Sequence, residues 1–559
     1  MRPGTLTTVV YLAACAAYPF AANADWFEDA TGTAGIAFDH VNGATGDFWF
    51  PEIMGGGAAI LDYDGDGRYD VYLVQSGDIG PAVEKSGRKA GDRLLRNVTE
   101  KGGAMRFEDV TERARIDARG YGQGVAVGDY DGDGDADIYV LNFGPNQLWR
   151  NNGDGTFEDV TKQAGVGDPG WGVSAAFADL DGDALPELFV VNYVDYQFDT
   201  HRECRAAGSS RRDYCSPSVY PFNRDTLYHN RGDGRFEDIS EAAGVADDPQ
   251  PGLGVVTADF NDDGHIDVYV ANDGEPNHFW LNQGDLTFID DALLAGNAVN
   301  AAGSAEAGMG VDAGDFDRNG ALDLFVTHLV RETNTLYAND GTGWFSDVSA
   351  QSGVGAPSLP KTAFGTAFVD LDLDGWLDLF VVNGGVTIEA DLAATDDPFP
   401  YHQTDQVFAN RQGRFVDVTA DAGRVLTESH VGRGAAFGDL DNDGRVDAVA
   451  ANNNGPAKLL RNVAGTGRAW LGLELVDAEG RTQVHAAVWL LGDDGSDLWL
   501  HRARTDGSYA SASDSRVVLG LGATAGAQSV RVIWPDGASE RFDELTPNRY
   551  HRLQRGDGS

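Results

Sequence analysis

The sequence predicts an all-β protein in which a seven-bladed β-propeller, closed by an N-terminal strand, precedes a small C-terminal β-sandwich. Three observations lead to this prediction. An acidic loop between two apolar strands occurs seven times, and a Phe-containing strand is repeated equally often. Both repeats stop near residue 465, and strands of a different pattern follow. The 73 glycines and the 10% aromatic content agree with short strands joined by tight turns.

The acidic loop is clearest at residues 129–137, where carboxylates occupy positions 1, 3, 5 and 9 and glycine occupies position 6. Glycine permits the sharp turn that brings these side chains together. An all-oxygen ligand set of high charge favours Ca²⁺ over Zn²⁺ or Mg²⁺. An EF-hand is excluded, because that loop needs a bidentate Glu at position 12 and flanking helices, whereas strands flank this one. We name these segments metal loops 1 to 7 and expect up to seven bound Ca²⁺ ions.

The predicted ligands stand at positions 1, 3, 5 and 9 of each metal loop. In loops 1 to 4 they are Asp62, Asp64, Asp66 and Asp70; Asp129, Asp131, Asp133 and Asp137; Asp179, Asp181, Asp183 and Glu187; and Asp259, Asn261, Asp263 and Asp267. In loops 5 to 7 they are Asp315, Asp317, Asn319 and Asp323; Asp370, Asp372, Asp374 and Asp378; and Asp439, Asp441, Asp443 and Asp447. In loop 3, Ala184 replaces the glycine and Glu187 the last Asp, so we expect this loop to be the weakest or empty. The alternative for the whole set is solvated acidic turns without metal.

Each metal loop joins strand A to strand B, and two further strands complete the repeat. Strand C ends in an Asn/Gly/Asp turn, as at residues 148–155, and strand D carries a Phe-x-Asp sequence, as at 157–159. Strand D begins at Phe107, Phe157, Phe236, Phe288, Phe345 and Phe415, but no copy follows the seventh loop. The missing copy stands at Phe27. We infer that the Phe27 strand pairs with the strand at 458–462 and closes the ring.

Strand direction places the metal loops and the C–D turns on one face of the ring, and the B–C and D–A connections on the other. The long insertions at 77–93, 194–224, 384–405 and 291–309 all belong to this second face. Insertions that gather on one face usually mark a binding face. Cys204 and Cys215 lie in the longest insertion, and we expect a disulfide between them, with two free thiols as the alternative. Glycines precede each strand A, which indicates close backbone approach around the central channel.

The charge and the N-terminus bear on location and partners. The formal net charge is −47, which argues against nucleic-acid binding and agrees either with bound cations or with an acidic, halophile-like surface. Residues 1–24 resemble an export signal with a small-residue cleavage site before Asp25, so we expect a secreted, periplasmic or cell-surface protein. The alternative is a lipid anchor at Cys15, after Leu12-Ala13-Ala14. No later stretch is long and apolar enough for a transmembrane span.

We assign residues 1–24 to the signal peptide, 25–465 to the propeller and 468–553 to the C-terminal domain. In the last of these, alternating strands are predicted at 470–476, 486–491, 497–501, 516–519, 529–534 and 549–553. The metal loops and their strands resemble the FG-GAP/VCBS repeats of integrin α-subunit propellers. Residues 507–513, 519–522 and 530–537 resemble an ASPIC/UnbV domain. Together they are similar to the cartilage acidic protein 1 family and its bacterial relatives, although residues 483–487 and Gly385 depart from that family's pattern.

The resemblance implies a secreted, calcium-binding, adhesion- or matrix-like protein. We therefore expect a binding module in which Ca²⁺ is structural and the inserted loops contact an extracellular protein or glycan. One alternative is an extracellular enzyme with a site at the channel mouth, where His430 and Arg433, or His328 and Arg331, are the candidates. No nucleophile–base pair accompanies them in the sequence. The other alternative is a purely structural surface protein, so catalytic activity stays open.

Overall fold

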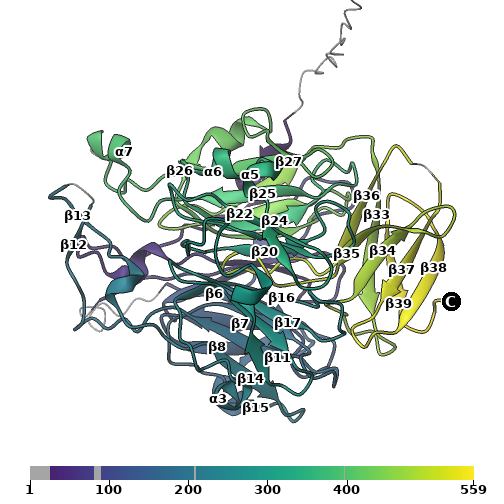
Figure 1. Ribbon diagram of the computed structural model, residues 1–559, viewed down its shortest axis with the longest axis horizontal. Coiled ribbons are helices and arrows are strands. Elements are labelled where there is room, and N and C mark those ends of the chain that lie inside the picture. The colour runs from purple at the N-terminus through teal and green to yellow at the C-terminus, as the bar shows by residue number, and fades with distance from the viewer. Residues whose placement is uncertain (1–24, 81–89, 207–208, 396, 525) are drawn as a thin grey trace, which may run out of the picture.

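A computed structural model describes residues 25–80, 90–206, 209–395, 397–524 and 526–559. The predicted signal peptide, Cys15 and part of the 77–93 insertion lie outside these residues. Seven antiparallel four-stranded sheets form a propeller, and two further sheets form a C-terminal domain at its side (Figure 1). The predicted all-β fold is confirmed.

Each blade follows the predicted order of strands A to D. The first four blades are β2 to β5 (Ala58–Leu61, Asp70–Leu73, Arg93–Asn97, Phe107–Asp109), β6 to β9 (Gly122–Gly128, Asp137–Asn142, Gly144–Asn151, Phe157–Asp159), β10, β11, β14 and β15 (Gly172–Ala178, Glu187–Asn192, Thr226–Asn230, Phe236–Asp238), and β16 to β19 (Gly252–Ala258, Asp267–Asn272, His278–Asn282, Phe288–Asp290). The last three are β20 to β23 (Val311–Gly314, Asp323–Val326, Thr335–Asn339, Phe345–Asp347), β24, β25, β27 and β28 (Ala363–Val369, Asp378–Asn383, Gln406–Asn410, Phe415–Asp417), and β30 to β32 with β1 (Gly432–Gly438, Asp447–Asn452, Lys458–Asn462, Phe27–Asp29).

A short helical turn follows most D strands, because the Asp that ends the strand binds the first residue of the turn. In blade 2, Asp159 accepts hydrogen bonds from the Thr161 amide at 3.0 Å and from its hydroxyl at 2.6 Å. Gly165 then ends the turn with a φ of 81°, a value that favours glycine. The turns of this kind are α1 (Thr31–Ala34), α2 (Thr161–Ala164), α3 (Ser240–Ala243), α4 (Ala292–Ala295) and α5 (Ser349–Ser352).

The remaining short elements belong mainly to the face that carries the insertions. They are α6 (Gly355–Ser358), α7 (Ala390–Ala394), the 3₁₀ turns at Phe50–Ile53, Pro217–Val219 and Arg424–Thr427, and two small ribbons, β12 (Cys204–Arg205) with β13 (Arg212–Asp213) and β26 (Gln403–Thr404) with β29 (Ser429–His430). In Figure 1, β12, β13 and α7 project on the side of the propeller opposite the C-terminal domain.

The N-terminal strand closes the ring, as predicted. β1 pairs with β32, so that Phe27 lies opposite Asn462. The Phe27 side chain is buried, and its ring lies 5.2 Å from the ring of Phe380 in blade 6. Across the closure, Ile60 of blade 1 shares a core with Val449 of blade 7. The first and last strands of the propeller chain therefore belong to one blade.

The C-terminal domain packs a three-stranded sheet on a four-stranded one. The first is β36 (Val517–Gly522), β33 (Ala469–Val476) and β39 (Tyr550–Gln554), and the second is β35 (Asp497–Arg502), β34 (Ala487–Leu491), β37 (Gln528–Ile533) and β38 (Ser539–Leu545). β38 was not among the predicted strands. This edge strand buries only Phe542 and Leu545 among its seven residues, so the apolar alternation that signals a strand is weak there.

A segment of the C-terminal domain fills the centre of the propeller. We name residues 505–514 the channel segment. It forms hydrogen bonds of 2.6–3.2 Å with the inner strand of every blade. In the order of blades 1 to 7, the donor and acceptor atoms are Ala512 N to Ala58 O, Val125 N to Ala510 O, Ala510 N to Ser174 Oγ, Thr257 N to Asp506 Oδ2, Val311 N to Ser508 O, Thr366 N to Ser508 Oγ and Asp514 N to Phe437 O. A Cβ on Gly124 would lie 2.1 Å from the Val173 carbonyl oxygen of the next blade and 3.0 Å from Ala510 Cα, so a side chain at this position would clash with both. The channel is thus occupied by the chain itself.

Candidate metal centres and the opposite face

The first carboxylate of each metal loop holds the turn. In loop 2, Asp129 accepts hydrogen bonds from the amides of Asp133 at 3.1 Å and Gly134 at 2.9 Å. The same two bonds recur in the other six loops, including loop 3, where the Ala184 amide takes the place of the glycine amide at 3.0 Å. Ala184 adopts a left-handed φ of 70°, so the turn survives without glycine.

The carboxylate at position 9 ties the loop to strand C of its own blade. Asp137 is fully buried and accepts from the Tyr130 amide at 3.0 Å and the Asn151 amide at 2.7 Å. Its counterparts are buried in the same way and accept from the equivalent amides: Asp70, Glu187, Asp267, Asp323, Asp378 and Asp447. Position 9 is therefore structural as well as a candidate ligand.

A ring of asparagines, not predicted from the sequence, links each metal loop to the next blade. The Asn151 side chain donates from Nδ2 to the Tyr63 carbonyl of metal loop 1, at 2.9 Å. An equivalent bond joins every other blade to the metal loop of the preceding blade. The donors are the side chains of Asn97, Asn230, Asn282, Asn339, Asn410 and Asn462, and the acceptors are, respectively, the carbonyls of Leu440, Tyr130, Leu180, Phe260, Phe316 and Leu371. The signal was present, because Asn ends strand C in all seven repeats.

Several carboxylates of the metal loops have raised pKa values. Burial, with a smaller contribution from neighbouring carboxylates, raises the pKa of Asp70 and of Asp267 to about 8. Burial also raises the pKa of Asp129 to about 6. A cation beside these groups would stabilise their charged forms and offset the mutual repulsion.

The carboxylate at position 3 has a free oxygen in three of the loops. Among the described residues, Oδ1 of Asp64, of Asp131 and of Asp441 is buried and has no hydrogen-bond partner. A buried acceptor without a partner costs about 1–3 kcal/mol. These oxygens lie beside the other carboxylates of their loops, so they fit an oxygen-binding cation such as Ca²⁺.

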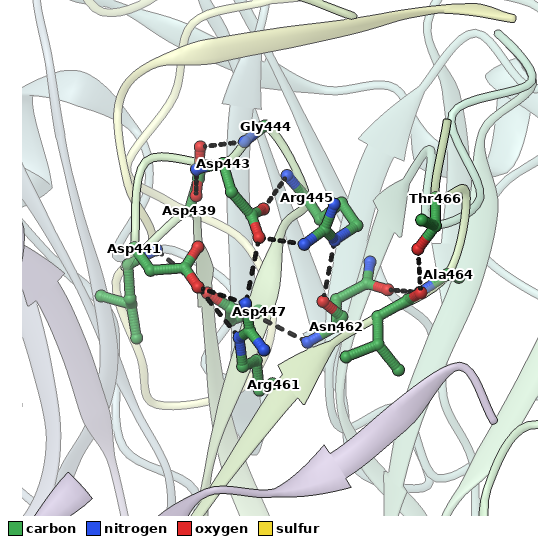
Figure 2. A network of polar contacts seen from close by, with 12 residues as sticks. Asp439, Asp441, Asp443, Gly444, Arg445, Asp447, Arg461, Asn462, Ala464 and Thr466 are labelled. Atoms are coloured by element: carbon green, nitrogen blue, oxygen red, sulfur yellow. Dashed lines mark hydrogen bonds and ion pairs between the residues drawn. The ribbon is translucent and has the colours of Figure 1, made fainter. Parts of the chain in front are cut away.

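Arginines supply part of the counter-charge in loops 1 and 7. Figure 2 shows Arg461 beside Asp441 and Asp443, and Arg445 beside Asp443. The Arg461 guanidinium contacts an Asp441 carboxylate oxygen at 2.9 Å, and Arg96 contacts Asp64 of loop 1 at 2.6 Å. These two arginines occupy the same place on strand C, opposite Glu28 and Glu108 of strand D.

The C-terminal domain covers part of the metal-loop face. Tyr550 donates to the carboxylate of Asp439 in loop 7 at 2.8 Å, and Arg468 donates to the Asp372 side chain in loop 6. Loops 1 to 4 instead border a cleft of about 810 Å³ between the propeller and this domain. Its walls include Asp129, Asp181, Arg481 and Arg552.

On the opposite face, the 194–224 and 384–405 insertions pack against each other, and we name these two segments together the cap. Asp213, in the 194–224 insertion, accepts hydrogen bonds from the Tyr401 hydroxyl at 2.9 Å and the Ile388 amide at 2.9 Å, both in the 384–405 insertion. Cys204 and Cys215 form the expected disulfide. The cap rests on an aromatic cluster that also contains Tyr509 of the channel segment.

Of the residues considered for catalysis, Arg433 holds loops in place. Arg433 is fully buried and donates to the carbonyls of Ile53 at 2.7 Å, Gly384 at 3.1 Å, Gly385 at 3.0 Å and Gly432 at 2.6 Å. Its guanidinium also stacks on Phe364, 4.1 Å from the ring centre.

The two histidines and Arg331 occupy different surroundings. His328 is buried, and burial lowers its pKa to about 4. His430 lies on β29, with its Nε2 3.9 Å from the Glu428 carboxylate. Arg331 is exposed. The structure therefore does not gather these three residues and Arg433 around one site.

Comparisons with known proteins agree with this geometry. A family model described as FG-GAP-like repeat matches residues 62–140, 129–190, 210–270, 259–326 and 315–381, and one described as ASPIC and UnbV matches residues 477–559. Cartilage acidic protein 1 of Homo sapiens is 30% identical over 165 residues, which are 28% of this chain and 24% of that protein. The Xenopus tropicalis protein is 30% identical over 165 residues, 28% of this chain and 25% of its own length. The matched region is thus about a quarter of these relatives.

Among solved structures, the BP39L lectin from Burkholderia pseudomallei aligns with a TM-score of 0.40 and 12% identity, over 74% of this chain and 97% of the lectin. No helix in the described part of the chain is long and apolar enough to cross a membrane.

Proposed function

Because this chain belongs to the FG-GAP-like repeat family and ends in an ASPIC and UnbV domain, we propose that it is a secreted, calcium-stabilised binding protein. Calcium ions in the metal loops brace one face of the propeller, and the cap on the other face contacts an extracellular protein or glycan. The disulfide between Cys204 and Cys215 supports an oxidising compartment, such as the periplasm or the cell exterior.

The buried free oxygen at position 3 carries the calcium proposal. It recurs at Asp64, Asp131 and Asp441, in loops that lie in different blades. An isolated unpartnered oxygen would be a local defect, but the same atom at the same loop position in three blades indicates a common ligand. Carboxylate oxygens at positions 1, 3, 5 and 9 make that ligand a hard cation that tolerates irregular coordination.

Two features support the cap as the contact surface. First, hydrogen bonds to Asp213 join the two insertions, and the disulfide braces the 194–224 insertion internally, so the surface is preformed. Second, residues 194–224 contain five arginines and four acidic residues, in a chain with 41 basic and 88 acidic residues. Arg202, Arg205 and Arg211 are exposed there. An acidic protein surface or acidic glycan is the partner that this local charge fits.

Calcium is tested by thermal unfolding of the full chain. We expect chelation to lower the melting temperature markedly, Ca²⁺ near 10⁻³ M to restore it, and Mg²⁺ to restore it poorly, because Mg²⁺ demands regular octahedral geometry. Asp131→Asn and Asp441→Asn should each reduce the number of bound Ca²⁺ ions measured by calorimetry. A melting curve unchanged by chelator would reject structural calcium.

The cap is tested by a binding screen against glycans and extracellular proteins. The variant carries Arg202→Ser, Arg205→Ser and Arg211→Ser, and the matched control carries Arg231→Ser, Arg235→Ser and Arg414→Ser, three exposed arginines at the C–D turns of the metal-loop face. We expect the cap variant to lose binding by about tenfold or more and the control to retain it. Equal loss in both would show that overall charge, and not the cap, governs binding.

A further inference from the structure

One position on strand C faces the metal loop of its own blade, and its residue differs between blades. The residues opposite the middle of strand D are Arg96, Arg150, His229, Leu281, Ala338, Ala409 and Arg461. In blades 1 and 7, the arginine at this position reaches the position-3 carboxylate of the loop. Blade 3 is the blade that has a histidine here, so a ring nitrogen enters a site that elsewhere offers oxygen alone.

The histidine points into metal loop 3. His229 Nδ1 lies 3.0 Å from Oε1 of Glu187 and 3.7 Å from Oδ2 of Asp181. Glu187 replaces the Asp found at position 9 of the other loops, so its side chain is longer by one methylene. The ligand atoms of Asp181, Glu187 and His229 all lie within 4.8 Å of one another.

Asp179, Asp181 and Asp183 of loop 3 offer oxygen alone, but the group of Asp181, Glu187 and His229 includes a nitrogen, which Ca²⁺ does not favour. We propose that loop 3 binds a transition-metal dication of the Zn²⁺ class through Asp181, Glu187 and His229. Imidazole nitrogen with carboxylate oxygen suits Zn²⁺, Co²⁺ and similar ions. Ligands about 2.0–2.1 Å from a tetrahedral ion are roughly 3.3 Å apart, and the two distances from His229 Nδ1 bracket that value.

The surroundings hold the three ligands in place. The Leu180 amide donates to Oε2 of Glu187 at 2.8 Å and the Asn230 amide to Oε1 at 3.3 Å, which orients a carboxylate that is fully buried. Such supporting bonds are typical of metal ligands. Asp181 also lines the cleft between propeller and C-terminal domain, so an ion there can be reached from solvent and can keep a position for water or an anionic ligand.

The proposal concerns loop 3 alone and does not depend on calcium in the other loops. It also accounts for Glu187, one of the two places at which the loop departs from the repeat. Ala184 preserves the turn through its left-handed backbone, whereas Glu187 changes only the ligand set. A loop that is weak for Ca²⁺ is then selective for another ion.

The test uses the metal-free full chain titrated with Co²⁺, whose visible absorption reports nitrogen and oxygen ligation, and then with Zn²⁺ as competitor. Titrations are made with Ca²⁺ held near 10⁻³ M, which fills the calcium-type loops. We expect one equivalent of Co²⁺ to bind, Ca²⁺ to leave it in place and Zn²⁺ to displace it.

The discriminating variant is His229→Arg, which places in blade 3 the residue that three other blades carry at this register and so preserves the fold. We expect it to weaken Co²⁺ binding by more than about 100-fold, beyond the effect of losing a supporting contact. The control is His265→Ala, an exposed histidine in loop 4, which should leave the Co²⁺ spectrum unchanged.

The proposal is overturned if His229→Arg binds Co²⁺ like the wild type, or if Ca²⁺ displaces Co²⁺ stoichiometrically. Either result would leave only a hydrogen bond between His229 and Glu187. Calcium uptake by the other loops is measured separately, by calorimetry on the Zn²⁺-loaded protein, so failure at loop 3 is distinct from failure of structural calcium.

Discussion

Tyr509→Ala should loosen the C-terminal domain from the propeller. The Tyr509 side chain is fully buried, its ring lies 4.8 Å from that of Phe364, and its hydroxyl donates to the Met54 carbonyl at 3.0 Å. Burying an aromatic ring removes about 150–250 Å² from water, worth about 4–6 kcal/mol at 25 cal/mol per Å². Measured truncations of buried aromatic residues cost about 3–5 kcal/mol. We expect a loss of about 4 kcal/mol in the docking of the channel segment.

Limited proteolysis and thermal unfolding together measure this loss. In the wild type, residues 505–514 should resist cleavage, and both domains should unfold in one transition. In Tyr509→Ala, cleavage there should accelerate and the transition should broaden or split, since the two domains no longer unfold as one unit. Tyr509→Phe keeps the ring and removes one hydrogen bond, so it should lose only about 1 kcal/mol. A Tyr509→Ala protein that melts within about 1 °C of wild type, with the segment still protected, would show that Tyr509 does not anchor the channel segment.

Three further variants test other features of the fold. Asn339→Ala removes the hydrogen bonds from Nδ2 to Phe260 O at 2.8 Å and to Leu322 O at 3.1 Å. It should lower the free energy of unfolding, measured with denaturant, by about 3 kcal/mol. The control Asn152→Ala changes an exposed residue and should lower it by less than about 0.5 kcal/mol. Burial raises the pKa of Glu52 to about 7 from 4.5, so the folded state retains a proton that the unfolded state loses, and stability falls as pH rises between these values. Glu52→Gln should therefore stabilise the protein at pH 8, by at most about 3 kcal/mol, and have no effect at pH 4; equal effects at both would contradict the titration. Cys204→Ser with Cys215→Ser opens a loop whose ends are 11 residues apart in sequence, and should destabilise the cap by about 3 kcal/mol. Amide exchange in residues 196–220 should become faster, while exchange in the blade strands should stay unchanged.

The repeats were sufficient to predict the propeller. Seven metal loops and seven Phe-x-Asp strands, offset by one, required the Phe27 strand to complete the last blade, and β1 does pair with β32. The separation of metal loops from insertions also follows from strand order, and the disulfide from two cysteines that lie close together in one insertion. Such features are periodic and local, so one chain displays them several times over.

Contacts between distant segments were decided by the tertiary structure. Nothing periodic marks Tyr509 or Ala510 as channel residues, because the surface that buries them is assembled only when all seven inner strands meet. The cap likewise depends on Asp213 meeting Tyr401 across 188 residues of chain. The contact between His229 and Glu187 depends on the pairing register of β11 and β14 and on the shape of metal loop 3. Sequence thus determined which local elements form and how often, whereas close packing of separate elements determined which side chains share a site.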